Sequence, residues 1–473
     1  MELIGRIRER KILDDCYQDI EPRFVAVYGR RRVGKTWLIR EHFQNRFEFY
    51  VSGSADESMQ GQLENFRNAL RKYFKDEVPM LKNWKAAFWA LEAAISKDNN
   101  RSKKIIFIDE LPWLDTPKSG FLSALEYFWN SFAQARPDIL LIVCGSAASW
   151  MIKNLINNYG GLHNRVTDRI ELKPFSLAEC EEYLKSKGIV FNRYQIAEAY
   201  MIFGGIPYYL NVMEKGLSLN QNIDRLLFVK DAKLGGEYER LFHSLFRHSE
   251  IHMKIVAEMS KNNDGLSRQD ILSATGLSNG GGFSKAMTEL EQCGLVSKTY
   301  DFNKRRRGEY YRVADFFSIF HMKYLAKRKP NDEHYWSNFL LSPSHSSWCG
   351  YAFERLCFAH IQQIKQKLGI NGVMCEVSSW RSKTSQHGAQ IDLLIDRADG
   401  VINLCEIKYY SEELAIDSKL DAALQHKRDA FRSETGTRKA LHQTLISTYG
   451  AIQNAYKNNI QSEVLLDDLF AYH

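Results

Sequence analysis

The chain has 473 residues, enough for two to four domains, and its composition, 44% hydrophobic and 26% charged, is that of a soluble globular protein. No segment is long and apolar enough to span a bilayer, and the N-terminal stretch MELIGRIRER lacks the apolar core of a signal peptide. The 8 cysteines include no C-x-x-C pair, which argues against a zinc knuckle or a disulfide framework and for a reducing cytoplasm. The net charge of +7 is compatible with a nucleic-acid partner without being diagnostic of one.

The first predicted strand is the apolar run Phe24 to Tyr28, which leads into the segment GRRRVGKT and then an amphipathic helix. This is the phosphate-loop pattern G-x-x-x-x-G-K-[ST] in its required strand–loop–helix context. Glycines let backbone N–H groups approach phosphates, and the helix offers its positive N-terminal end. Lys35 is expected to reach the β and γ phosphates of ATP, and Thr36 to hold Mg²⁺. The alternative is a glycine-rich turn with a solvated lysine. The predicted nucleotide contacts in this segment are Gly29, Arg30, Arg31, Arg32, Val33, Gly34, Lys35, Thr36 and Trp37.

A second buried strand, Ile105 to Ile108, ends in two acids, Asp109 and Glu110. This pattern resembles the Walker B element, in which Asp109 positions Mg²⁺ through its water shell and Glu110 polarises the attacking water. Two acids that cap a strand end are the alternative. A third strand, residues 139–146, ends in Ser146, which either senses the γ-phosphate or simply terminates the strand. Residues 51–104 are predicted to be helical, because their apolar residues recur with a spacing near 3.6.

Six segments, in this order along the chain, together resemble the archaeal-type ATPase family: LIGRIRERKIL, GRRRVGKTWLI, IFIDELPWL, CGSAASWM, NRVTDRIELKPFS and GGIPYYL. That family belongs to the STAND and AAA-like P-loop NTPases and is distantly similar to replication-origin initiators. The resemblance implies that Gly5 and Arg6 lie near the adenine, and that Gly205 and Pro207 close over the base or sugar. It also implies an arginine finger, either Arg165 or Arg169, although a structural ion pair explains each of these arginines equally well.

Residues 174–240 are predicted to form a small helical lid. From about residue 245 the pattern becomes a helix, a helix–turn–helix and a β-hairpin, which resembles a winged helix. The hairpin turn, residues 303–308, holds a basic run that suits the backbone phosphates of DNA. That run is Lys304, Arg305, Arg306 and Arg307. A solvated turn and an intramolecular hinge are the alternatives, because the presumed recognition helix opens with three glycines and carries Glu289 and Glu291.

The C-terminal part is predicted to hold a β-hairpin, with strand Ala389 to Asp396, the turn RADG and strand Val401 to Tyr409. If the hairpin is centred on the aspartate of that turn, Asp392 lies opposite Glu406, and Lys408 follows on the same face. A one-residue change of register would place the two acids on opposite faces and remove the site.

Two facing carboxylates repel one another unless a divalent cation lies between them, and oxygen ligands suit Mg²⁺ or Mn²⁺. Such an ion would activate a water for attack on a phosphodiester, with Lys408 orienting that water. The alternative is a salt-bridged hairpin at the protein surface. Apolar flanks such as DLLI and NLCEI weaken that alternative, because they place the acids at the edge of a core.

The ordered set of Glu354 on a preceding helix, Asp392, Glu406 and Lys408 resembles the PD-(D/E)XK nuclease fold. The resemblance implies catalytic roles for these four residues, with Asp392 and Glu406 as metal ligands. It also implies an accessory polar role for Gln425. Gln390 stands where the family commonly has an acid, which is a departure from the pattern.

The predicted fold class is α/β. We expect a P-loop NTPase core with a parallel sheet at residues 1–173, a helical lid at 174–240, a winged helix at 241–328 and an α/β restriction-endonuclease-like domain at 329–473. The leading hypothesis is a cytoplasmic ATPase that couples ATP and Mg²⁺ to DNA binding or to metal-dependent DNA cleavage. The alternative is a nucleotide-switched homo-oligomeric scaffold whose nuclease-like domain binds without cutting. A sequence-specific transcription factor fits least, because the basic charge is modest.

Overall fold

The structure is a computed structural model, and it describes residues 3–75, 77–98, 100, 102–157, 164–246, 248–263, 265–300, 302, 309–326, 332–340, 342–382 and 388–472. These residues divide into two units. Unit 1 contains Met1–Pro174, Leu241–Ser249 and Thr288–Gly294. Unit 2 contains Phe175–Arg240, Glu250–Met287 and Leu295–His473.

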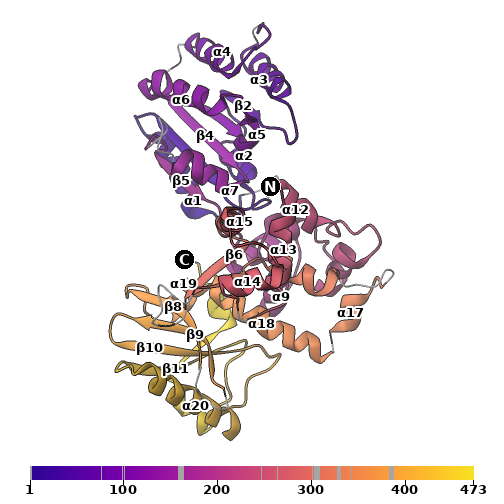
Figure 1. Cartoon of the computed structure of the whole chain (residues 1–473), viewed down its shortest axis with the longest axis vertical. Helices are drawn as coiled ribbons and strands as arrows, with labels where there is room; N and C mark the ends of the chain where they lie inside the picture. The colour runs from indigo at the N-terminus through magenta and orange to yellow at the C-terminus, as the bar shows by residue number, and fades with distance from the viewer. Residues whose placement is uncertain are drawn as a thin grey trace. The chain divides into compact units, whose positions relative to one another are not determined.

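Unit 1 is built on a five-stranded sheet with the strand order β2-β3-β4-β1-β5 (Figure 1). Its strands are β1 (Arg23–Tyr28), β2 (Phe49–Ser52), β3 (Lys104–Asp109), β4 (Ile139–Gly145) and β5 (Asp168–Glu171). All neighbouring pairs are parallel, which confirms the predicted α/β fold with a parallel sheet. The helical prediction for residues 51–104 is wrong at Val51 and Ser52, which complete β2 because they pair with the end of β3, and at Lys104, which begins β3 and pairs with β4.

Helices enclose this sheet on both faces, as a parallel sheet requires. Those of unit 1 are α1 (Ile7–Gln18), α2 (Lys35–His42), α3 (Met59–Phe74), α4 (Trp84–Ser96), α5 (Leu111–Leu114), α6 (Phe121–Ser131), η1 (Ala133–Ala135), α7 (Ala148–Met151) and η2 (Ile152–Ile156). One core cluster packs Phe66, Trp84 and Phe128 from α3, α4 and α6 against inward residues of the strands. β3 and β4 are buried along their whole lengths, so the residues that follow their carboxyl ends are held rigidly.

Several helices follow between residues 177 and 245, and the lid proposed for residues 174–240 stays a prediction. The elements are α8 (Leu177–Ser186), α9 (Arg193–Phe203), α10 (Pro207–Asn211), α11 (Leu219–Ile223), η3 (Asp224–Phe228) and α12 (Glu237–Leu245). Capping boxes at Ser176, Asn192 and Ser218 explain where three of these helices begin, because each cap satisfies backbone N–H groups that the first turn leaves unpaired.

Three helices and a two-stranded antiparallel hairpin follow in the order expected of a winged helix. They are α13 (Glu250–Met259), α14 (Arg268–Thr275), α15 (Gly281–Gln292), β6 (Val296–Tyr300) and β7 (Glu309–Val313). In this hairpin Tyr300 pairs with Glu309. The basic turn Lys304 to Arg307 lies outside the described residues, and the identification of a winged helix stays a prediction.

The C-terminal part of unit 2 contains a second, mixed five-stranded sheet with the order β12-β11-β10-β9-β8. Its strands are β8 (Cys375–Arg381), β9 (Gln390–Arg397), β10 (Val401–Lys408), β11 (Ala440–Ser447) and β12 (Ser462–Leu465). The accompanying helices are α16 (Phe316–Phe320), η4 (His321–Leu325), α17 (Tyr335–Phe339), α18 (Pro343–Ala359), α19 (Ile361–Lys367), α20 (Ser418–Thr435), η5 (Tyr456–Asn459) and η6 (Leu466–Phe470). Across the described residues, no helix combines the length and the apolar content needed to cross a bilayer.

Candidate functional site

The loop between β1 and α2 has a backbone that depends on glycine at both ends. Gly29 adopts φ +144°, and a Cβ there would lie 2.3 Å from the carbonyl oxygen of Leu172. Gly34 adopts φ +93° and caps the N-terminus of α2. The loop therefore curves tightly into a helix start, where free N–H groups and the helix dipole favour a bound anion.

The ammonium group of Lys35 is held inside this curve. Its Nζ donates to the carbonyl oxygens of Gly29 and Arg30, both at 3.0 Å, and the side chain is only 5% exposed. Arg6, from the segment before α1, is also buried and donates to the carbonyl oxygen of Val33 at 3.2 Å. The predicted first segment of the family pattern thus lies against the phosphate loop, while its contact with adenine stays a prediction.

Thr36 contacts Asp109, although β4 lies between β3, which ends at Asp109, and β1, which precedes the loop and helix of Thr36. The Thr36 hydroxyl donates to Asp109 Oδ2 at 2.9 Å, and the thiol of Cys144, at the end of β4, donates to Oδ1 at 2.7 Å. Burial raises the pKa of Asp109 above its ordinary value. A hydroxyl and a carboxylate are the oxygen donors that Mg²⁺ prefers, so these two residues fit the predicted magnesium role.

Glu110, the residue after Asp109, is hydrogen-bonded to Ser146. The Ser146 hydroxyl donates to Glu110 Oε1 at 2.7 Å, and its backbone N–H donates to Oε2 at 3.2 Å. Glu110 adopts a left-handed backbone with φ 45° directly after β3. The structure therefore gives Ser146 a position beside the candidate water-polarising acid, whereas contact with a γ-phosphate stays a prediction.

The other predicted nucleotide contacts are less closely connected. Trp37 on α2 is 47% exposed, Arg169 is exposed on the edge strand β5, and Arg165 is half-buried in the segment before it. Neither arginine is singled out as the finger. Gly205 and Pro207 belong to unit 2, where a Cβ at Gly205 would lie 2.3 Å from the carbonyl oxygen of Phe175. The close approach of the Phe175 carbonyl is sufficient to require glycine at position 205.

The C-terminal hairpin has the register that the sequence predicts. β9 and β10 pair antiparallel, with Leu394 opposite Leu404 and Leu393 opposite Cys405, so the next position places Asp392 opposite Glu406. The backbone N–H of Ile407 donates to Asp392 Oδ2 at 3.2 Å. Glu406 is only 6% exposed, which argues against a fully solvated ion pair at this position.

Glu406 is neutralised by two lysines rather than one. Lys408 Nζ lies 2.8 Å from Oε1, and Lys427 Nζ, from α20, lies 2.6 Å from Oε2. Lys427 was not among the predicted residues, and the predicted accessory residue Gln425 instead donates to Asp421 and accepts from Arg428. Residues two apart on a helix point about 200° apart, so Lys427 and Gln425 cannot both face the sheet. The buried neighbours Leu424 and Phe431, three before and four after Lys427, are the signal that would have found it.

The protonation of the acids follows from burial and neighbouring charge. Burial and the nearby Asp392 raise the pKa of Glu354 to about 8, so this carboxyl is mostly neutral at pH 7. Burial and Glu406 raise the pKa of Asp392 to about 6. Burial alone would raise the pKa of Glu406, but Lys408 and Lys427 together lower it below the ordinary value.

These contacts correct one step of the sequence argument, which required a divalent cation to relieve repulsion between Asp392 and Glu406. The two lysines already supply positive charge, and a cation between the acids would compete with them. Within the described part of the chain, no three carboxylate, imidazole or thiol groups are grouped to hold a metal. The donors still fit Mg²⁺, which is usually bound by one or two carboxylates together with water and substrate phosphates.

Comparison with known proteins gives a family match in the N-terminal part of the chain. Residues 3–213 match a family described as an ATPase domain predominantly from Archaea. The chain is 23% identical over 397 residues to an uncharacterized protein of Methanocaldococcus jannaschii, and the alignment covers 83% of each.

Two solved structures are similar to this chain with lower sequence identity. A Walker-type ATPase of Pyrococcus abyssi shares 16% identity over 68% of this chain and 96% of its own, with a TM-score of 0.49. The ORC2 protein of Aeropyrum pernix, solved in ADPNP–ADP complexes, shares 13% identity over 67% and 93%, with a TM-score of 0.42. Neither likeness carries an argument about what this chain binds. The family match, together with the loop that holds Lys35 and the Thr36–Asp109 contact, makes residues 3–213 a P-loop ATPase domain.

Proposed function

We propose that this ATPase domain controls a C-terminal PD-(D/E)XK-type domain that cleaves DNA with the help of Mg²⁺ or Mn²⁺. The observation that carries the proposal is the buried Glu406, which lies opposite Asp392 on the hairpin and contacts Lys408. Burying a carboxylate is costly unless a charge balances it, so such a cluster is retained where chemistry uses it.

Each residue has a role that its environment supports. Asp392 and Glu406 offer carboxylate oxygens to a divalent cation, whose chemistry here would be to acidify a bound water and to stabilise charge on a scissile phosphate. Lys408, next to Glu406, would orient the attacking water and donate to the phosphate. Glu354, held mostly neutral at pH 7, would donate a hydrogen bond rather than add a third negative charge.

At the first site, Thr36 and Asp109 would hold Mg²⁺ with ATP, Lys35 would bind the phosphates, and Glu110, oriented by Ser146, would polarise the water. The nucleotide state would then set whether DNA reaches the C-terminal domain. A winged helix at residues 241–328 and the lid at 174–240 would link the two activities, and DNA is the proposed partner.

Cleavage of supercoiled plasmid tests the proposal. Wild-type protein should nick DNA with Mg²⁺ or Mn²⁺ and not in EDTA, and Asp392→Ala and Lys408→Ala should each lower the rate at least about 100-fold. Lys439→Ala is the matched control, because Lys439 pairs with Asp396 on the same hairpin. Unchanged nicking by Asp392→Ala and Lys408→Ala would show that the assigned site is wrong.

A second candidate is a nucleotide-switched homo-oligomeric scaffold whose C-terminal domain binds nucleic acid without cutting. The double neutralisation of Glu406 by Lys408 and Lys427 favours it, because the cluster is balanced without a metal. Light scattering with ATP and with ADP, run beside the plasmid assay, separates the two. Assembly that depends on ATP, with no cleavage by any divalent ion, supports the scaffold.

A further inference from the structure

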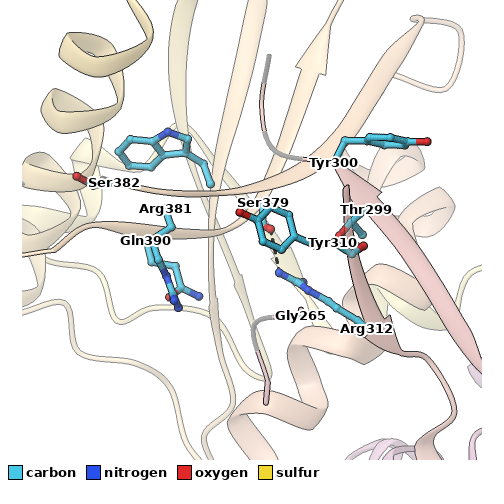
Figure 2. A pocket seen from close by; sticks show the side chains of 10 residues that line it. Gly265, Thr299, Tyr300, Tyr310, Arg312, Ser379, Arg381, Ser382 and Gln390 are labelled. Atoms are coloured by element: carbon cyan, nitrogen blue, oxygen red, sulfur yellow. Dashed lines mark hydrogen bonds between the residues drawn. The ribbon is translucent and has the colours of Figure 1, made fainter. Parts of the chain in front are cut away.

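Unit 2 contains a cavity of about 160 Å³ between the hairpin β6–β7 and the edge strand β8 with its neighbour β9 (Figure 2). Tyr300, Tyr310 and Arg312 line it from the hairpin, and Ser379, Arg381 and Gln390 line it from the sheet. Of the described residues that line the cavity, two are arginines and none is acidic. The combination of tyrosine rings and guanidinium groups suits a ligand with planar bases and phosphates.

The size of the cavity limits what enters it. Small-molecule sites usually occupy roughly 300–1,000 Å³, whereas a cavity of roughly 150 Å³ holds a single benzene-sized ring. The volume of about 160 Å³ therefore suits one base or one sugar–phosphate unit, not a complete dinucleotide cofactor. A polymer that places one unit in the cavity and continues beyond it meets this limit.

The cavity lies beside the candidate cleavage site in the sheet itself. The pairing of β8 with β9 shifts register, since Ser378 is opposite Leu394 but Trp380 is opposite Ile391. Two β9 residues, Asp392 and Leu393, therefore face the single β8 residue Ser379. Such bulges re-aim side chains and are frequent next to active sites. Ser379 lines the cavity, so its wall adjoins Asp392.

Arg312 connects the cavity with helix α18. Its guanidinium donates to Ser379 Oγ at 2.9 Å, and Figure 2 shows Tyr310 and Arg312 extending from β7 toward this serine. The same guanidinium lies 5.7 Å from the ring centroid of Phe358, one helical turn after Glu354. Its positive charge acts on the Glu354 carboxyl. A phosphate held at Arg312 would thus lie beside Ser379, which faces Asp392 and Leu393 across the β8–β9 pairing, and near Phe358 on the helix that carries Glu354.

We propose that this cavity binds one unpaired nucleotide of a nucleic-acid strand and aligns the strand with Asp392 and Glu406. Tyr310, with Tyr300 at the rim, stacks on the base, while Arg312 and Arg381 contact the adjoining phosphates. The inference rests on the proposed function, because it names the substrate form for that site: a single strand, a flap or a frayed end rather than continuous duplex.

Binding without cleavage tests this assignment. Full-length protein in EDTA is titrated into a fluorescein-labelled single-stranded 15-mer and into the matching duplex, and anisotropy is followed at several salt concentrations. Tyr310→Ala should weaken single-strand binding about 5- to 100-fold, because stacking on one aromatic ring contributes that much. Arg381→Gln should lower the salt slope by about 0.7, the value for one phosphate contact on a single strand. Duplex binding should change less than twofold.

Matched controls come from the opposite edge of the same sheet. Tyr456, on η5 between β11 and β12, is 37% exposed, and Arg438, before β11, is also exposed. Tyr456→Ala and Arg438→Gln should bind like the wild type. Tyr310→Phe keeps the ring and should retain affinity, which guards against a folding defect in Tyr310→Ala.

The inference is overturned if wild-type protein does not bind the single strand, if the cavity variants bind it as the wild type does, or if their duplex binding weakens equally. Displacement by poly-glutamate as strong as by oligonucleotide would assign the cavity to an acidic protein and also overturn it. Normal binding by cavity variants refutes this inference alone, and normal cleavage by Asp392→Ala refutes the proposed function alone.

Discussion

The chain contains two candidate sites built around a pair of carboxylates, and the partners of the carboxylates differ between them. Asp109 and Glu110 receive hydrogen bonds from neutral groups, the hydroxyls of Thr36 and Ser146 and the thiol of Cys144. In contrast, Glu406 forms ion pairs with two cations, Lys408 and Lys427. A site bonded by neutral donors gains most from a cation that arrives with its substrate, whereas a site that contains its own cations is balanced before substrate binds.

The pKa shifts reflect this difference. Burial raises the pKa of Asp109, because its neutral donors do not fully offset the cost of desolvation. The pKa of Glu406 is lowered despite burial, because two ammonium groups stabilise the charged form. We therefore expect the first site to depend on Mg²⁺ with nucleotide, and the second to admit a divalent ion only in competition with lysine.

The largest effect should come from Lys35→Ala, which removes the ammonium that the loop carbonyls hold. We expect ATP hydrolysis to fall at least about 100-fold, since this group binds the charge that develops on the phosphates. Phosphate release with Mg²⁺ and ATP measures it, with the exposed Lys11→Ala as control. Equal turnover by Lys35→Ala and wild type would contradict the assignment of the nucleotide site.

Glu354→Gln should change stability in a pH-dependent way. Because the folded-state pKa is raised to about 8, the folded chain retains a proton that the unfolded chain releases near pH 4. The stability that this group contributes is fully present below about pH 4 and is lost as the pH rises toward 8. At pH 8.5 the variant should be about 2–4 kcal/mol more stable than wild type, with equal stability at pH 4.

Urea unfolding at a series of pH values measures this difference. The exposed Glu413→Gln is the control and should follow the wild-type curve at every pH. Parallel pH profiles for wild type and Glu354→Gln would show that the carboxyl of Glu354 titrates normally.

Ser146→Ala removes the hydroxyl that orients Glu110 and leaves its backbone N–H in place. We expect kcat for ATP hydrolysis to fall about tenfold with little change in KM, because a misplaced general base affects chemistry more than binding. Ser149→Ala, on α7, is the control. A change confined to KM would instead support direct contact between Ser146 and the nucleotide.

The smallest effect should be tighter binding of a divalent cation at Asp392 and Glu406. Lys427→Ala removes one of the two cations that hold Glu406, so Mn²⁺ should bind about fivefold more tightly. Calorimetric titration of the nucleotide-free protein measures it, and Lys439→Ala should not change the affinity. Unchanged affinity in Lys427→Ala would favour the scaffold that binds without cutting.

Local sequence was sufficient for the features that depend on neighbours along the chain. The phosphate loop follows from four residues at fixed spacing, Gly29, Gly34, Lys35 and Thr36, because glycine conformation and the helix start are local requirements. The hairpin register that pairs Asp392 with Glu406 follows from a short turn and strict strand alternation. Both features are set within a few dozen residues.

Contacts between distant segments were decided only by the tertiary structure. The placement of β4 between β3 and β1 brings Cys144 to Asp109, and the packing of α20 on the sheet brings Lys427 to Glu406. Local sequence does not specify these contacts, because a strand can join a sheet at several positions. The spacing of Leu424 and Phe431 indicates which side of α20 is buried, but not which strand residue that side meets. The balance of charge around Glu406 therefore depended on helix packing, which the burial of Leu424 and Phe431 determines.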